Sequence, residues 1–193
     1  MEEGYLGNVK ILVIDDLPFT RSLVRRILKV FGGRDVMDAP DGAKALKLMQ
    51  NFEPDLIILD WDMESMNGIE FTRNVRDSGN FPNPFVPIIM LSAYSTRAHV
   101  IEARDAGVTE YVIKPFSAKS LFSRIQAVID SPRPFVRTEG FFGPDRRRKE
   151  KEIEISDRRK RVPEMDQAMS QDQVDDFMTT PPADEKEKKS GTF

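Results

Sequence analysis

Acidic side chains, a hydroxyl and a lysine follow short apolar segments at four places along this chain. They are the pair Asp15 and Asp16, Asp60 with Asp62 two residues later, Ser92, and Lys114 before Pro115. Clustered carboxylates repel one another unless a cation neutralises them. Oxygen-only ligands suit Mg²⁺, which keeps several waters and bridges to phosphate oxygens. If the four places meet in space, these residues form a magnesium-assisted phosphoryl site.

Each residue type has a role in such chemistry. A carboxylate beside Mg²⁺, here Asp60, is a nucleophile toward phosphorus and gives an aspartyl phosphate. We expect Asp16 and Asp60 to hold the metal directly, with Asp15 acting through water. Lys114 supplies a cation for the phosphoryl oxygens and Ser92 supplies a hydroxyl donor. Little more is needed, because phosphoryl transfer depends mostly on positioning and charge neutralisation.

Five apolar runs alternate with segments of helical spacing and would position this chemistry. The expected strands cover residues 9–14, 34–37, 55–59, 86–91 and 110–114. The expected helices begin at Pro18, after Gly42, after Gly68, near Ser95 and after Ser117, and the last ends near Asp130. Continuous apolar strands indicate a parallel sheet covered on both faces. The expected class is α/β, a doubly wound (βα)5 flavodoxin-like sheet, which places its site at the carboxyl ends of the strands.

Composition narrows the class of protein further. The 193 residues carry a net charge of −3, which argues against a general nucleic-acid binder. The absence of cysteine excludes disulfides and thiolate-bound metals. No apolar run approaches the roughly 18 residues that span a bilayer. We therefore expect a soluble, cytoplasmic protein without a membrane segment.

Four strings, IDD, LDWDM, MLSA and YVIKPF, resemble the CheY-like response-regulator receiver family over residues 8–130. The resemblance implies that a histidine kinase phosphorylates Asp60 and that Asp15 and Asp16 form the acidic metal-binding pair. It also implies a metal contact from the backbone carbonyl of Asp62. Ser92 would be the switch hydroxyl, and Tyr111 would turn inward when that hydroxyl moves toward the phosphoryl group.

Such a protein is not an enzyme but a phosphoacceptor, limited to autophosphorylation from small donors and autodephosphorylation. The sequence departs from the family at Glu64, where proline is usual, and at Asp62 and Tyr94, which occupy positions that tune hydrolysis. Haloacid-dehalogenase-type phosphatases also use an Asp-x-Asp pair with Mg²⁺. Those enzymes place that pair on the first strand, whereas here another acidic pair comes first and no cap domain is visible.

The tail, residues 131–193, lacks the alternating pattern and is too polar to fold alone, so we expect it to be mostly disordered. It shows no helix-turn-helix pattern, which argues against DNA binding. A basic segment, 144–161, contains Arg146, Arg147 and Arg148. Guanidinium groups bind phosphates bidentately and stack on purines. The segment resembles the arginine-rich extension of certain CheY-like motor proteins that bind cyclic di-GMP; the alternative is a solvated linker.

One short amphipathic helix is expected within the tail, over residues 170–178. Ser170 and Gln173 form a capping box. Val174, Phe177 and Met178 lie on one apolar stripe, which suits docking in a groove. The string SQDQVDD resembles the receiver-binding peptide of the chemotaxis phosphatase CheZ and the amino-terminal segment of the switch protein FliM. The helix would bind a receiver, its own or another; a chance amphipathic turn is the alternative.

Together these features predict a phosphorelay response regulator that signals through protein–protein contacts in chemotaxis or flagellar motility, with motor proteins among its partners. Two alternatives remain. One is a cyclic di-GMP-responsive adaptor in which the arginine-rich tail is the main sensor. The other is a phosphotransfer sink that drains a kinase.

Overall fold

A computed structural model describes residues 4–77, 83–138, 141–145 and 168–179. The strands are β1 (Ile11–Ile14), β2 (Val36–Ala39), β3 (Leu56–Asp60), β4 (Ile88–Ser92), β5 (Glu110–Ile113), β6 (Phe135–Thr138) and β7 (Phe141–Pro144). The helices are α1 (Pro18–Val30), α2 (Gly42–Leu48), α3 (Gly68–Arg76), α4 (Arg97–Ala106), α5 (Ala118–Asp130) and α6 (Gln171–Thr179). The first ten elements alternate strictly, as the apolar pattern predicts.

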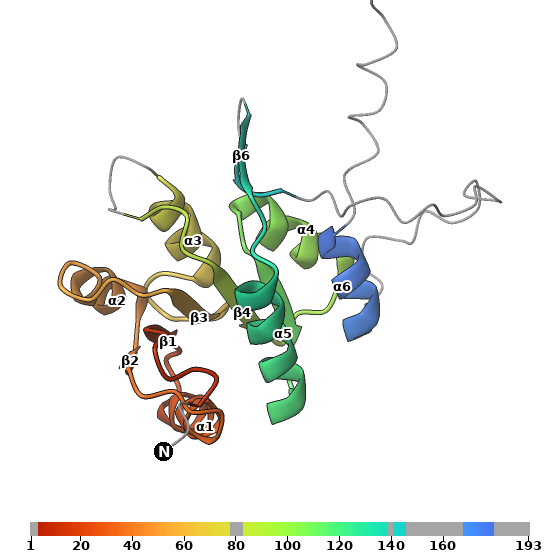
Figure 1. Ribbon diagram of the computed structural model, residues 1–193. Helices are drawn as coiled ribbons and strands as arrows, with labels where there is room; N and C mark the ends of the chain where they lie inside the picture. The colour runs from red at the N-terminus through yellow and green to blue at the C-terminus, as the bar shows by residue number, and fades with distance from the viewer. Residues whose placement is uncertain (1–3, 78–82, 139–140, 146–167, 180–193) are drawn as a thin grey trace, which may run out of the picture.

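The central sheet has five parallel strands in the order β2-β1-β3-β4-β5, which confirms the expected doubly wound α/β fold. Helices cover both faces (Figure 1). Alternate residues of each strand point to opposite faces, so two apolar layers form. Ile11 and Val13 pack in the layer that contains α1 and α5, whereas Leu12 and Ile14 pack in the layer that contains α2, α3 and α4.

Several strand boundaries differ from the sequence expectation. Asp60 and Ser92 are the last residues of β3 and β4, one residue beyond the expected strand ranges, because Asp60 pairs with Leu91 and Ser92 pairs with Ile113. The second strand begins at Val36, which pairs with Ile11, two residues later than expected. The polar strand ends therefore belong to the rigid sheet, which positions the functional side chains more firmly than a loop would.

A two-stranded antiparallel sheet, β6 and β7, follows α5. The sequence predicts that residues 131–193 are mostly disordered apart from one short helix, and this hairpin corrects that expectation for residues 135–138 and 141–144. Aromatic contacts explain its position, because Phe135 and Phe142 pack edge-on against Phe85. The buried guanidinium of Arg76 lies 5.0 Å from the ring centroid of Phe135 and donates to the carbonyl of Gly107.

The last described helix, α6, lies beside α4 on the right of the molecule in Figure 1 and also contacts β5. The capping box expected at its start is present, since Gln173 N donates to Ser170 Oγ and Ser170 N donates to Gln173 Oε1. In the described part of the chain, no helix has the length and apolar character needed to cross a membrane.

Candidate functional site: a carboxylate cluster at the strand ends

Three strand ends bring Asp15, Asp60 and Lys114 together. Lys114 Nζ lies 2.8 Å from Asp60 Oδ1 and 3.1 Å from Asp15 Oδ2. Both carboxylates are almost fully buried, with 1% of Asp15 and 5% of Asp60 exposed. The parallel sheet causes this convergence, because β1 and β3 are neighbours and β5 lies at the edge beyond β4. The expected nucleophile and the expected cation are therefore in direct contact.

The acidic residues offer a set of oxygen ligands. Carboxylate oxygens of Asp15, Asp16 and Asp60 all lie within 4.8 Å of one another. One oxygen of Asp15 is held by the backbone N–H of Leu17 at 2.8 Å, which orients that carboxylate. Three hard oxygen donors beside open solvent fit Mg²⁺, which binds few protein ligands and keeps several waters. Asp16 is the half-buried member and borders the solvent.

Burial and the neighbouring charges shift the pKa values of the groups in this cluster. Burial is the largest influence on the pKa of Asp60 and raises it, whereas the hydrogen bond and the charge of Lys114 lower it, and the net pKa is raised. The nearby charge of Asp15 raises it further. Burial lowers the pKa of Lys114, but the hydrogen bonds and charges of Asp60 and Asp15 outweigh burial, so the net pKa is raised. Lys114 thus stays a cation, and a divalent metal would relieve the remaining repulsion.

Ser92 and Tyr111 meet through the backbone of Tyr94. Ser92 Oγ accepts a hydrogen bond from Tyr94 N at 3.0 Å, and Tyr111 Oη donates to Tyr94 O at 2.6 Å. Tyr111 is fully buried, so its ring is turned inward. Burial raises the pKa of the Tyr111 hydroxyl to about 12, against a smaller opposite effect of Ser92. The two expected switch residues therefore bind the two backbone polar groups of one residue in the β4–α4 loop, its N–H and its carbonyl oxygen.

A cluster of three aromatic side chains borders the carboxylate site. Trp61 follows Asp60 directly and contacts the rings of Tyr94 and His99 edge-on. Tyr94 stacks on His99 with ring centroids 4.5 Å apart, and its hydroxyl donates to Asp62 Oδ2 at 3.2 Å. Asp62 itself is exposed, and the metal contact of its backbone carbonyl stays a prediction. Trp61 is thus placed to report changes at Asp60 by fluorescence.

Gly68 allows the loop after Asp60 to close. Its N–H donates to Trp61 O at 2.8 Å, and a Cβ atom there would lie 2.4 Å from the carbonyl oxygen of Asp60. No side chain fits at that distance. The tight approach of α3 to β3 therefore depends on glycine, which the sequence marks only as the residue after Asn67.

The tail residues named from the sequence divide into two groups. Val174 and Met178 are buried and Phe177 is half-buried against α4, so α6 docks on its own receiver fold. Arg146, Arg147 and Arg148 lie outside the described residues, and cyclic di-GMP binding stays a prediction. Sequence reasoning missed the residues that hold α6 in place. They are Glu110, Arg124, Arg133, Gln171 and Asp175.

The fold and the site together define a class of protein, a receiver with a buried aspartate, an acidic neighbour pair and a lysine at the strand ends. Comparison with known proteins agrees. The family model for the response regulator receiver domain matches residues 11–126. The chain belongs to this family. The hairpin and α6 lie beyond the matched residues.

Similar proteins come from chemotaxis systems. The chain is 32% identical to chemotaxis protein CheY-3 of Vibrio cholerae over 130 residues, which cover 67% of this chain and 98% of that protein. It is 34% identical to chemotaxis protein CheY of Pseudomonas aeruginosa over 122 residues, 63% of this chain and 97% of that one.

Solved structures show the same fold. That of Vibrio cholerae CheY4 has a TM-score of 0.57 at 33% identity and covers 62% of this chain and 98% of its own. The receiver domain of a sensor histidine kinase from Pseudomonas aeruginosa also has a TM-score of 0.57, at 28% identity, and covers 64% of this chain and 98% of its own. The latter has a magnesium ion coordinated in its active-site cleft.

Proposed function

We propose that this protein is a phosphorelay response regulator in which Asp60 accepts a phosphoryl group from a phosphohistidine of a histidine kinase. The contact of Lys114 Nζ with both Asp60 and Asp15 carries this proposal, because it joins nucleophile, acidic neighbour and cation in one buried cluster. Asp15, Asp16 and Asp60 would hold Mg²⁺, together with the carbonyl of Asp62. Bound there, the metal supplies neutralising charge for the phosphoryl oxygens.

The residues of this chain then have separate tasks in the transfer. An oxygen of Asp60 attacks phosphorus, a P–O bond forms, and the P–N bond to the kinase histidine breaks. Lys114 binds a phosphoryl oxygen and compensates the charge that Asp60 gains. Ser92 donates its hydroxyl to another phosphoryl oxygen and releases its hydrogen bond from Tyr94 N. The buried Tyr111 stabilises the rearranged loop through Tyr94 O.

The start of α1 offers a surface on which a kinase can reach Asp60. Helix α1 begins two residues after Asp16, so a protein bound to its first turns lies beside the carboxylate cluster. Phe19 is 79% exposed and Leu17 is 56% exposed, which is unusual for large apolar side chains. Arg25 and Arg26 are exposed on the same helix. An apolar surface with basic neighbours fits an acidic amphipathic partner.

For output, we propose protein–protein contacts in a chemotaxis or flagellar system, in line with the relatives named above. The alternative roles, a cyclic di-GMP-responsive adaptor and a phosphotransfer sink, depend on different parts of the chain. The adaptor needs the arginine-rich segment, whose residues 146–161 lie outside the described part. The sink needs only the carboxylate cluster.

Beryllofluoride, a mimic of the phosphoryl group, tests the proposal through Trp61. Added with Mg²⁺, it should change the fluorescence of the wild type and leave that of Asp60→Asn unchanged. A folded wild-type protein that binds Mg²⁺ but shows no response to beryllofluoride would contradict the proposal.

A further inference from the structure

The side-chain amide of Gln171 pairs with the backbone of the edge strand β5. Its Oε1 accepts from Ile113 N at 2.8 Å, and its Nε2 donates to Tyr111 O at 2.7 Å. Edge strands present unpaired N–H and C=O groups that attract other chains. One side-chain amide thus pairs with two backbone groups of β5. This pairing fixes the position and the orientation of the start of α6 on the strand.

Apolar side chains of α6 complete a layer of the core. Val174 is fully buried and Met178 is 2% exposed, and both belong to the cluster that contains Val100 and Ala103 of α4. The ring of Phe177 lies 4.6 Å from the guanidinium carbon of Arg104. Without α6, these α4 residues and the edge of β5 would meet solvent. The described fold therefore includes α6 as a covering element.

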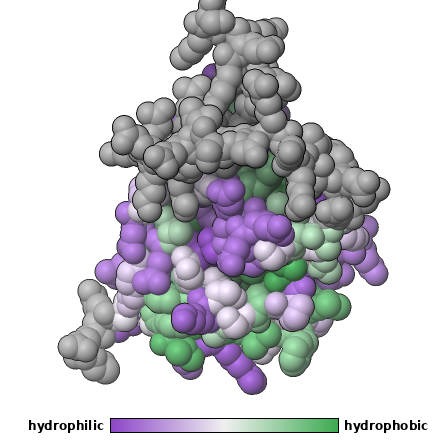
Figure 2. Space-filling model, turned by 90° about the vertical axis from the view of Figure 1, so that its right-hand side faces the viewer, coloured by the Kyte–Doolittle hydropathy of each residue, from purple (hydrophilic) through white to green (hydrophobic). Residues whose placement is uncertain are grey.

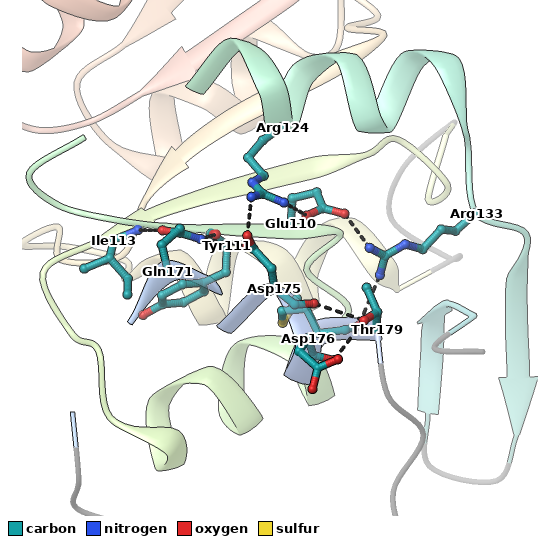
Figure 3. Close-up of polar contacts among 10 residues, drawn as sticks. Glu110, Tyr111, Ile113, Arg124, Arg133, Gln171, Asp175, Asp176 and Thr179 are labelled. Carbon is teal, nitrogen blue, oxygen red and sulfur yellow. Dashed lines mark hydrogen bonds and ion pairs between the residues drawn. The ribbon is translucent and has the colours of Figure 1, made fainter. Parts of the chain in front are cut away.

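Two arginines of the receiver fold lie beside the acidic helix α6. Arg124 of α5 forms an ion pair with Asp175 through one terminal guanidinium nitrogen. The other terminal nitrogen of Arg124 lies 3.8 Å from a carboxylate oxygen of the buried Glu110. Arg133 also pairs with Glu110, and it donates to the carbonyl of Met178 at 3.1 Å. Figure 3 shows Arg124 extending from α5 toward Glu110 and Asp175, and Arg133 beside Glu110 near the end of α6. Glu110 holds both in position, so the surface is prepared for an acidic helix.

The outward side of α6 is polar. Asp172, Gln173 and Asp176 are exposed. Figure 2, which views the molecule from this side, shows hydrophilic residues at the centre of the described surface and hydrophobic residues below them. The helix thus replaces an apolar surface by a polar one.

The segment before α6 touches the loop that the switch residues control. Met169 N donates to Ser95 O at 2.7 Å, and Ala168 forms an isolated bridge with Thr96. Tyr94, the preceding residue, is held by Ser92 and Tyr111. The docked tail therefore contacts the β4–α4 loop from outside while the phosphoryl-sensing residues contact it from inside. Through Gln171 it also binds the backbone carbonyl of Tyr111, whose buried ring contacts the same loop.

We infer that α6 is an intramolecular ligand of the surface formed by α4, β5 and α5, and that any acidic amphipathic helix from a partner must displace it. Docking of α6 and occupation of Asp60 favour the same inward arrangement of Tyr111, so each strengthens the other. This coupling rests on the proposed function, whereas occupation of the surface does not. The surface fits a partner helix with an amide at its start, a carboxylate one turn later and apolar residues between and beyond.

Competition with a free copy of the helix tests the occupation. The probe is a fluorescent synthetic peptide of residues 168–179, titrated without beryllofluoride against full-length proteins. Gln171→Ala and Asp175→Asn each remove a contact that holds α6. Asp172→Asn is the matched control, because it removes the same charge from an exposed position of the same helix. We expect the peptide to bind the first two variants at least about tenfold more tightly than the wild type or the control, because a tethered competitor lowers apparent affinity.

The possible outcomes are distinct. Equal peptide affinity for all four proteins, or binding to none, overturns the inference. Hydrogen exchange adds a structural readout, since the amide of Ile113 should exchange faster in Gln171→Ala and at the wild-type rate in Asp172→Asn; unchanged exchange in Gln171→Ala also counts against α6 docking.

The coupling has a separate test. The beryllofluoride midpoint, followed by Trp61 fluorescence with Mg²⁺, should rise about fivefold or more in Gln171→Ala relative to Asp172→Asn. Equal midpoints overturn the coupling and leave the peptide result in place. A wild type that does not respond at all contradicts the proposed function instead.

Discussion

The ammonium group of Lys114 lies 2.8 Å from Oδ1 of Asp60, although the two residues are 54 positions apart in the sequence. The same nitrogen lies 3.1 Å from Asp15, so one cation is shared between two buried carboxylates. The arrangement resembles the start of a phosphoryl transfer, because the cation is already next to the oxygen that would attack.

Replacement of Lys114 by glutamine should slow phosphorylation. The variant keeps the shape and some hydrogen bonding but loses the charge that compensates the transferred group. Loss of one such electrostatic contact lowers rates by about 10²–10³-fold. Initial rates with acetyl phosphate and Mg²⁺ measure the effect, and Lys119→Gln, at an exposed position on α5, is the control. A Lys114→Gln rate within twofold of the control would contradict this role.

Removal of the Asp60 charge should stabilise the metal-free fold. Burial raises the pKa of Asp60 above its unfolded value. A raised carboxyl pKa contributes stability that is present below the unfolded pKa and is lost as the pH rises through the folded pKa. In buffer with chelator, we therefore expect Asp60→Asn to be more stable than the wild type at pH 7, by about 1 kcal/mol. This advantage should shrink toward pH 4, as measured by urea unfolding.

In the presence of Mg²⁺, the wild type should be more stable than Asp60→Asn. At one hundred times its dissociation constant, a ligand of the folded state stabilises by about 2.7 kcal/mol. The wild type should gain this stability, and Asp60→Asn should gain much less because it lacks one carboxylate of the cluster. Asp172→Asn, which removes a carboxylate outside the site, should respond to Mg²⁺ as the wild type does. Equal gains for wild type and Asp60→Asn would argue against a metal at this cluster.

Alanine at Gly68 should damage the site without touching any charged group. Its Cβ atom would lie 2.4 Å from the carbonyl oxygen of Asp60, so β3 and α3 would have to separate. We expect a loss of stability of about 1–3 kcal/mol and weaker beryllofluoride binding. Chemical denaturation and Trp61 fluorescence check the two effects. Wild-type stability in this variant would show that the loop accommodates a side chain.

Phe19→Ser should separate kinase docking from the chemistry at Asp60. Phe19 is exposed on α1 and makes no contact that the fold needs, so rates with acetyl phosphate should stay unchanged. Transfer from a phosphorylated kinase should slow by tenfold or so, the effect of about 1.4 kcal/mol of lost binding. Val30→Ser, at an apolar residue that is 81% exposed at the far end of α1, should leave both rates unchanged. A similar slowing in both variants would rule out a specific surface at the start of α1.

The receiver fold and its principal carboxylates were predictable because both follow from local features of the sequence. Apolar runs mark strands, and the doubly wound topology brings their ends together, so Asp15, Asp60 and Lys114 could be grouped before any distance was known. The exact ends of β3 and β4 were less predictable, since pairing with neighbouring strands extended them to include Asp60 and Ser92.

The contacts that hold α6 in place were not predictable from apolar runs or from strand order. The apolar stripe of residues 174–178 marked a docking helix, and the resemblance of the string SQDQVDD implied a receiver as its receptor, but not which receiver or which contacts hold the helix. Gln171 binds backbone atoms of β5, which no side-chain pattern reveals, and Arg124 joins residues that are far apart in the sequence. The hairpin of β6 and β7 was missed because its strands are short and depend on aromatic contacts with Phe85.

Chemical trapping of the phosphorylated residue tests the central claim most directly. The full-length protein is incubated with Mg²⁺ and acetyl phosphate, the acyl phosphate is reduced with borohydride, and the modified peptide is located by mass spectrometry. We predict a single modification, at Asp60, that is absent from Asp60→Asn. Modification at another residue, modification that persists in Asp60→Asn, or none in the folded wild type would contradict the account.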